Sequence, residues 1–179
     1  TLDDNARALI ALCQKYELFG DQDDLTLIQL YLDFIGYCQQ KNGQFLNYIN
    51  QQKAFTQQNY TTNLADSNGR AIWALGYLTS LKSILPEGII EQAEQIFAKA
   101  LVHIEEVYST RAMAFIIKGL YYRNAHISSK NERILIELFA DRLVKMYQHE
   151  SDADWNWFES YLTYANSIIP EALACAWNI

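Results

Sequence analysis

Apolar residues recur along this chain at the spacing of an α-helix. Between Leu27 and Cys38 they fall at positions i, i+3, i+4, i+7, i+8 and i+11, and the stretch from Ile89 to Ile104 follows the same rule. Along the whole chain this pattern predicts helices over residues 4–19, 23–41, 67–84, 88–107, 109–123, 128–149, 152–164 and 168–178. The connections are short, so we expect neighbouring helices to form four antiparallel hairpins.

One segment breaks the helical pattern. Residues 42–65 are rich in Gln, Asn and Thr, and they carry aromatic residues such as Phe45 and Tyr48. We interpret this segment as an ordered loop or a small β-hairpin inserted between two helices, because long loops in a compact domain are often functional. Asn47 and Tyr48 are its candidate substrate-binding residues.

A polar motif opens two of the predicted helices. Residues 3–9 are Asp-Asp-Asn-Ala-Arg-Ala-Leu, and residues 66–72 are Asp-Ser-Asn-Gly-Arg-Ala-Ile. A fainter copy keeps Arg111, and a last one, Tyr164-Ala165-Asn166, keeps the asparagine and loses the charges. Similarity at such spacings indicates stacked copies of one supersecondary unit. It also places polar groups at the same end of several helices.

These patterns predict an all-α protein built as an α/α-hairpin toroid or solenoid. The odd-numbered helices would form the inner layer and carry the polar motif, and the even-numbered ones would form a charged outer layer. We expect residues 1–179 to be one domain, about four hairpins from the C-terminal part of a larger (α/α)6 barrel. The chain begins inside a motif and without Met, so we expect its natural N-terminus to lie upstream.

The polar motif has a structural and a functional interpretation. An aspartate in the first turn caps a helix and favours its dipole, and Asp3 and Arg7 form an i, i+4 pair. Capping needs only one short polar residue, however. Asp, Asn and Arg together would line a pocket with the acceptors and donors that suit a hydroxyl-rich ligand. On this interpretation the binding residues from the motif copies are Asn5, Arg7, Asn68, Arg70, Arg111, Tyr164 and Asn166.

A second rich segment is Asp152-Ala153-Asp154-Trp155-Asn156-Trp157-Phe158-Glu159. On a helix, Trp155, Phe158 and Glu159 would share one face. A tryptophan beside a carboxylate is suited to hold a sugar, with the ring on its apolar face and the acid on its hydroxyls. An aromatic core is the alternative for this segment.

Composition narrows the classes of partner. The 21 acidic residues outnumber the 14 Lys and Arg, which gives a net charge of −7 and argues against a nucleic-acid partner. No apolar stretch reaches membrane-spanning length. We interpret Cys13, Cys38 and Cys175 as small apolar residues. The three histidines lack metal-binding spacing, so we expect no metal and no cofactor.

Taken together, these segments resemble a known family. The two full motif copies, Phe45-Leu46-Asn47-Tyr48, Trp155-Asn156-Trp157-Phe158-Glu159 and the run Leu162 to Leu173 are similar to an α-helical domain of bacterial carbohydrate-active proteins. That domain accompanies glycosyltransferases, and its hairpins are similar to those of six-hairpin glycosidase-like toroids. The family's last motif usually carries Asp and Arg, and here those positions are Ala165 and Ile168.

The resemblance implies a carbohydrate partner at the inner-helix ends, with a glycosyltransferase domain on the same or a neighbouring chain. Because the sequence contains no signal peptide, we expect a cytoplasmic protein. One interpretation is a glycoside hydrolase, which needs two carboxylates beside the scissile bond. Its catalytic candidates are Asp4, Asp66 and Glu159, with Arg7 and Arg70 orienting hydroxyls. A non-catalytic glycan-binding domain of a glycosyltransferase and a purely structural helical scaffold are the alternatives. Sugar epimerases on similar toroids use histidines at inner-helix ends, and no histidine occupies a motif position here.

Overall fold

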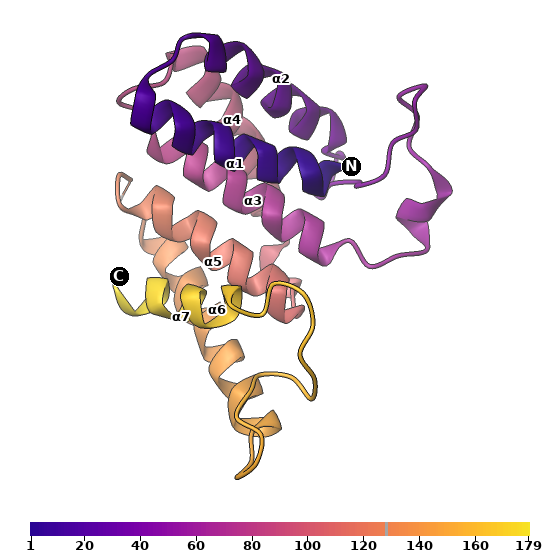
Figure 1. Ribbon diagram of the computed structural model, residues 1–179, viewed down its shortest axis with the longest axis vertical. Helices are drawn as coiled ribbons and strands as arrows, with labels where there is room; N and C mark the ends of the chain where they lie inside the picture. Colours follow the sequence, from indigo (N-terminus) through magenta and orange to yellow (C-terminus); the bar gives the residue numbers. More distant parts are fainter. Residues whose placement is uncertain (128) are drawn as a thin grey trace.

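The computed structural model describes residues 1–127 and 129–179 and is all-α. Figure 1 shows its helices, which are α1 (Leu2–Phe19), α2 (Asp23–Cys38), α3 (Ala65–Ser80), α4 (Glu87–Ala100), α5 (Thr110–Asn124), α6 (Lys130–Glu150) and α7 (Ile168–Trp177). Two short 3-10 helices, η1 (Gln57–Tyr60) and η2 (Ile104–Glu106), lie in the connections. The all-α class predicted from the sequence is therefore confirmed. Ser128, where one predicted helix begins, lies outside the described residues.

The helices form two layers. Helices α1, α3, α5 and α7 lie side by side, and α2, α4 and α6 pack behind α1, α3 and α5 (Figure 1). The inner helices run in the same direction, because Gly69 and Gly76 of α3 face Ala112 and Gly119 of α5 in the same order along the chain. In the same way, Arg70 and Tyr77 of α3 contact Asp3 and Glu17 of α1, and Arg111 and Lys118 of α5 contact Asn166 and Glu171 at α7. Their N-terminal ends therefore meet at one edge of the molecule.

Local sequence explains where several helices begin and end. The side chains of Thr1, Ser109 and Ser129 accept hydrogen bonds from the backbone N–H three residues later and so cap α1, α5 and α6. Gly20 ends α1 in the left-handed conformation, at φ 64°, which glycine adopts without strain. Pro86 stands just before α4, where its missing N–H costs nothing.

The inner helices α3 and α5 are buried on almost every side. Their backbones approach at small residues, so that a side chain at Gly76 or Gly119 would meet the backbone of the facing helix. Around this pair the core collects large side chains such as Phe45, Phe97 and Phe139. The tight contact fixes α3 and α5 as a rigid platform for the residues at their N-terminal ends.

The segment 42–65 is an ordered excursion. It holds two isolated antiparallel bridges, Gln39–Phe45 and Ile49–Phe55, before η1. The buried side chain of Asn59 organises it, because its amide accepts from the backbone N–H groups of Asn47 and Tyr48 and donates to the Tyr48 carbonyl. Asn47 and Tyr48 are thereby held beside the N-terminal end of α1.

The helix predicted over 152–164 is wrong. This segment is irregular, because Asp152 accepts from the N–H groups of Asp154 and Trp155 and closes a turn instead of opening a helix. Trp155, Phe158 and Glu159 therefore do not share a helical face. It follows that α7, predicted as the outer helix of a fourth hairpin, instead takes the inner position beside α5.

Candidate functional site

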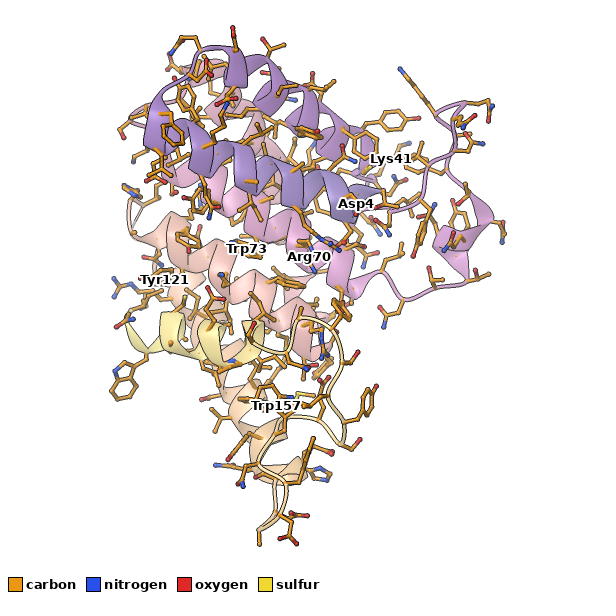
Figure 2. All side chains as sticks on the ribbon, viewed as in Figure 1. Asp4, Lys41, Arg70, Trp73, Tyr121 and Trp157 are labelled. Atoms are coloured by element: carbon orange, nitrogen blue, oxygen red, sulfur yellow. The ribbon has the colours of Figure 1, made fainter. Side chains whose placement is uncertain are left out.

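The N-terminal ends of the four inner helices bring the motif copies together. We call this edge the inner rim; it comprises residues 1–7, 63–70, 109–111 and 159–168. Figure 2 shows Asp4 and Arg70 at the same ends of α1 and α3, with Trp73 further along α3. Because the inner helices run in the same direction, motif copies that are far apart in the sequence lie close together in space.

An ion pair joins the first two motif copies. The Arg70 Nε donates to Asp3 Oδ1 at 2.6 Å, and Arg7 donates to the other oxygen of Asp3. Only 7% of Arg70 is exposed, and its guanidinium lies 4.0 Å from the centre of the Phe115 ring. The second motif is thus held by an acid of the first, and not by its own Asp66.

Asp66 connects α3 to the next two units. It accepts a hydrogen bond from the Ser109 hydroxyl at 2.5 Å on one oxygen and from the Tyr164 hydroxyl on the other. Burial, together with the hydrogen bond to Asp66 and its charge, raises the pKa of Tyr164. Both carboxylate oxygens of Asp66 are therefore already engaged by hydroxyl donors.

Arg111 holds the irregular segment before α7. Its guanidinium donates to the Tyr164 carbonyl at 2.5 Å, to Glu159 at 2.8 Å and to the Asn166 side chain at 2.9 Å. Burial opposes ionisation of Glu159, but hydrogen bonds from Arg111 and Thr110 and the charge of Arg111 outweigh it, so the pKa of Glu159 is lowered. The second oxygen of Glu159 is buried and has no partner among the described residues.

A stack of rings and cations continues along the inner helices from the rim. The Phe115 and Trp73 rings are nearly parallel, with centres 5.8 Å apart, and the Lys118 ammonium lies 4.0 Å from the centre of the Trp73 ring. Lys118 is buried and pairs with Glu171 of α7. Together with Arg70 on Phe115, this stack ties α3, α5 and α7 together.

A recess of about 440 Å³ opens at the inner rim. The exposed guanidinium of Arg7 and the half-buried ring of Tyr48 line it, together with Asp66 and Tyr164. The Asn47 side chain also lines it and is only 7% exposed. Its oxygen accepts from the Asp3 N–H at 3.0 Å, whereas its amide nitrogen donates to none of the described residues. The other lining residues are Thr1, Asp3, Asn63, Ser67 and Ser109.

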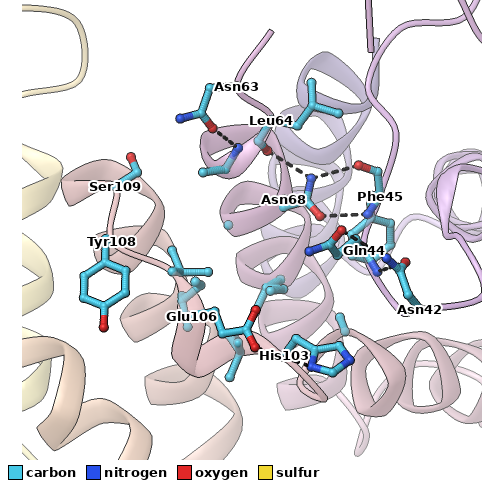
Figure 3. Close-up of a pocket in the computed structure, with 17 residues that line it drawn as sticks. Asn42, Gln44, Phe45, Asn63, Leu64, Asn68, His103, Glu106, Tyr108 and Ser109 are labelled. Atoms are coloured by element: carbon cyan, nitrogen blue, oxygen red, sulfur yellow. Dashed lines mark hydrogen bonds and ion pairs between the residues drawn. The ribbon is translucent and has the colours of Figure 1, made fainter. Parts of the chain in front are cut away.

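A neighbouring pocket of about 450 Å³ accounts for another candidate residue (Figure 3). Asn68 lines this pocket and not the recess at the inner rim. Its amide donates to the carbonyls of Phe45 and Leu64, and its oxygen accepts from the Phe45 N–H at 2.7 Å. Asn68 therefore anchors the inserted segment to α3.

Three further candidates lie outside the recess. Asp4 is exposed and takes part in the cap of α1, where hydrogen bonding by Thr1 lowers its pKa. Asn5 donates to the Thr1 carbonyl, and the Trp155 indole donates to the Glu159 carbonyl at 2.7 Å. Of the predicted binding residues, Arg7, Asn47, Tyr48 and Tyr164 meet at the recess, and the predicted catalytic residue Asp66 joins them. Arg70, Arg111, Glu159 and Asn166 do not line the recess and are engaged in contacts between the helices and the irregular segment.

Asp3 was predicted as a helix-capping and ion-pair residue but not as a site residue. Its i, i+4 spacing to Arg7 was the available signal, but its decisive partner is Arg70, 67 positions away. Ser109 was not among the predicted site residues, although it both caps α5 and donates to Asp66.

A scan against protein-family models finds no match for this chain, and no curated protein matches it. In the part of the chain that the structure describes, no three His, Cys, Asp or Glu side chains are grouped to hold a metal. Over the same residues, no helix is both long and apolar enough to cross a membrane.

Proposed function

We propose that this chain binds carbohydrate in the recess at the inner rim, as a glycan-recognition domain. The observation that supports this most directly is the lining of the recess. The Arg7 guanidinium and the Asn47 amide nitrogen, which has no acceptor among the described residues, offer donors, and Tyr48 and Tyr164 offer rings with hydroxyls. Sugars present hydroxyls around an apolar ring face, which matches such a mixture.

The contacts favour binding over hydrolysis. A glycosidase needs one carboxylic acid with a raised pKa and a second carboxylate free to act as base or nucleophile. The pKa values of Asp4 and Glu159 are shifted downward, and both oxygens of Asp66 accept hydrogen bonds from neighbouring hydroxyls. Of the three predicted catalytic residues, none is therefore prepared as an acid.

The resemblance to the six-hairpin glycosidase-like domain supports the same ligand class. Three α/α hairpins with parallel inner helices, continued by α7, are also what an arc of an (α/α)6 toroid would contain. In that arrangement the inner rim is one mouth of the ring. We propose a glycosyltransferase domain, on this chain or beside it, as the partner that the bound glycan serves.

Binding is tested with two tyrosines of the inserted segment. Tyr48→Ala removes a ring from the recess, while Tyr60→Ala removes an exposed ring of η1 as a matched control. After a glycan array selects a ligand, calorimetry is expected to show about tenfold weaker binding for the first variant and unchanged binding for the second. Equal affinity of both variants would contradict the site.

The same preparation separates the three functions. Release of reducing ends from the bound glycan by the unmutated protein, lost in Asp66→Asn, would establish hydrolysis instead. If no glycan on the array binds, the polar motif serves only to hold the helices together, and the protein is the helical scaffold of the third alternative.

A further inference from the structure

A separate pocket of about 290 Å³ lies at the opposite end of the inner helices. It is formed by Glu17 in the last turn of α1, by Tyr77 and Ser80 at the end of α3, and by Tyr122 and His126 at the end of α5. None of these residues belongs to the inner rim. The volume is near the lower limit of about 300 Å³ for ligand pockets, so it suits a ligand of few atoms.

Two aromatic rings and one carboxylate dominate the pocket. The Tyr77 and Tyr122 rings meet edge to face, with centres 4.7 Å apart. The Tyr77 hydroxyl donates to Glu17 Oε2 at 2.6 Å, which fixes the carboxylate beside the rings. Tyrosine faces and a carboxylate both attract positive charge.

The Glu17 carboxylate has no cationic partner among the described residues, and the last turns of α1 and α3 contain no basic side chain. Arg123 in the last turn of α5 is already paired with Glu94 and Glu132. The C-terminal end of a helix carries a partial negative charge that a cation would offset. Lys82 donates to the His126 carbonyl, but its own side chain is not part of the lining.

Burial disfavours ionisation of both tyrosines. Burial first, then the hydrogen bond to Glu17 and its charge, raise the pKa of Tyr77. Burial first, then Cys175 and the carboxylates of Glu171 and Glu17, raise the pKa of Tyr122. Both tyrosine hydroxyls therefore stay protonated and neutral, and Glu17 is the acidic side chain that lines this pocket.

We propose that this pocket binds a small organic cation, a quaternary or primary alkylammonium group, with its charge held between the Glu17 carboxylate and the Tyr122 ring. The protein's net charge of −7 favours the approach of such a ligand. This site is independent of the carbohydrate recess, because the two lie at opposite ends of the inner helices and share no lining residue.

The test is a calorimetric titration of the whole chain with choline and, separately, with its uncharged isostere 3,3-dimethyl-1-butanol. It is run at about pH 8, where an ordinary histidine is neutral. We expect choline to bind with a stoichiometry of one and the alcohol to show no saturable binding. Glu17→Gln keeps an acceptor for the Tyr77 hydroxyl but removes the charge, and is expected to weaken choline binding about tenfold.

Glu91→Gln is the matched control, because it removes the same charge from an exposed glutamate of α4 that does not line the pocket. Its choline affinity is expected to equal that of the unmutated protein. Tyr122→Leu is expected to weaken binding while melting as a folded protein, which separates loss of the ring from loss of structure. The proposal is overturned if choline does not saturate at millimolar concentration, if the alcohol binds equally well, or if Glu17→Gln binds choline as Glu91→Gln does.

Discussion

The contact between α3 and α5 makes a sharp prediction about Gly76. A Cβ at this position would lie 2.6 Å from the carbonyl carbon of Gly119 and 2.7 Å from its Cα. Both are backbone atoms, so no side chain can rotate away. Restoring an ordinary carbon contact requires the two helices to separate by roughly 1 Å, which would loosen every other contact between them.

The magnitude follows from two opposing terms. Overpacking a core costs about 3 kcal/mol when the backbone itself must move, and alanine gains about 1 kcal/mol over glycine in a helix. Gly76→Ala is therefore expected to lower the free energy of unfolding by about 2 kcal/mol. For a chain of this length that corresponds to roughly 4–8 °C in Tm.

Thermal melting followed by circular dichroism is the assay, with Gly88→Ala as the control. Gly88 lies in α4, and a Cβ there would meet nothing within 4 Å, so this variant is expected to be neutral or more stable by up to about 1 kcal/mol. If the two variants melt alike, the helices are not in the close contact described, and the reasoning fails.

Three further predictions concern the rim and the core. Asp3→Ala leaves the buried Arg70 unpaired and is expected to lower the free energy of unfolding in urea by about 3 kcal/mol. Asp4→Ala, at an exposed position, should lower it by less than about 0.5 kcal/mol, and equal losses would refute the ion pair. Because the pKa of Glu159 is lowered in the folded protein, its ionised form stabilises the fold at pH values above the ordinary carboxyl pKa. This stabilisation is lost as the pH falls through the pKa of the folded state. The Tm deficit of Glu159→Gln should therefore shrink below about pH 4, and a constant deficit would argue against it. Burial is the main cause that raises the pKa values of Cys13 and Cys38 to about 12, so neither thiol should react with iodoacetamide at pH 8 in the native protein. Rapid labelling of either cysteine, detected by mass spectrometry, would contradict their burial.

Most helices could be predicted from the sequence because each buries one stripe of apolar residues. The i, i+3, i+4 pattern from Ile89 to Phe97 is the buried face of α4. In α2 the helix was predicted but its buried face only in part, because Ile35 and Cys38 of the predicted stripe are buried while Leu27 and Leu30 are exposed. The repeat of Asp, Asn and Arg correctly placed the first two motif copies at the starts of α1 and α3. Local periodicity and local capping were enough for these features.

The irregular segment before α7 could not be predicted in this way. Its residues have helical spacing, but Asp152 closes a turn and Glu159 is drawn to Arg111, 48 positions earlier. Phe158 is buried against Tyr147 and Trp157. These are long-range contacts that outweigh a local preference, and no signal within the segment identifies its partners.

The roles of the motif residues divide for the same reason. Asn5 and Asn68 occupy equivalent motif positions, and each donates to the carbonyl four residues earlier. Only Asn68 also binds the backbone of Phe45, because the inserted segment passes beside α3. A repeat in sequence therefore predicts equal local contacts, while the neighbours that each copy meets decide which side chains remain free for a ligand.

The parallel inner helices give the two ends of the molecule partial charges of opposite sign. Their N-terminal ends carry partial positive charges that would repel one another, and acids in the first turns, Asp3 and Asp66 among them, offset this. Those acids are then engaged by Arg70, Ser109 and Tyr164, so a ligand at the inner rim is left to the remaining amide, guanidinium and hydroxyl groups. At the C-terminal ends the partial charges are negative, and Glu17 adds to them instead of cancelling them. The common direction of the inner helices therefore underlies both proposals, a neutral polyhydroxylated ligand at the inner rim and a cation at the opposite end.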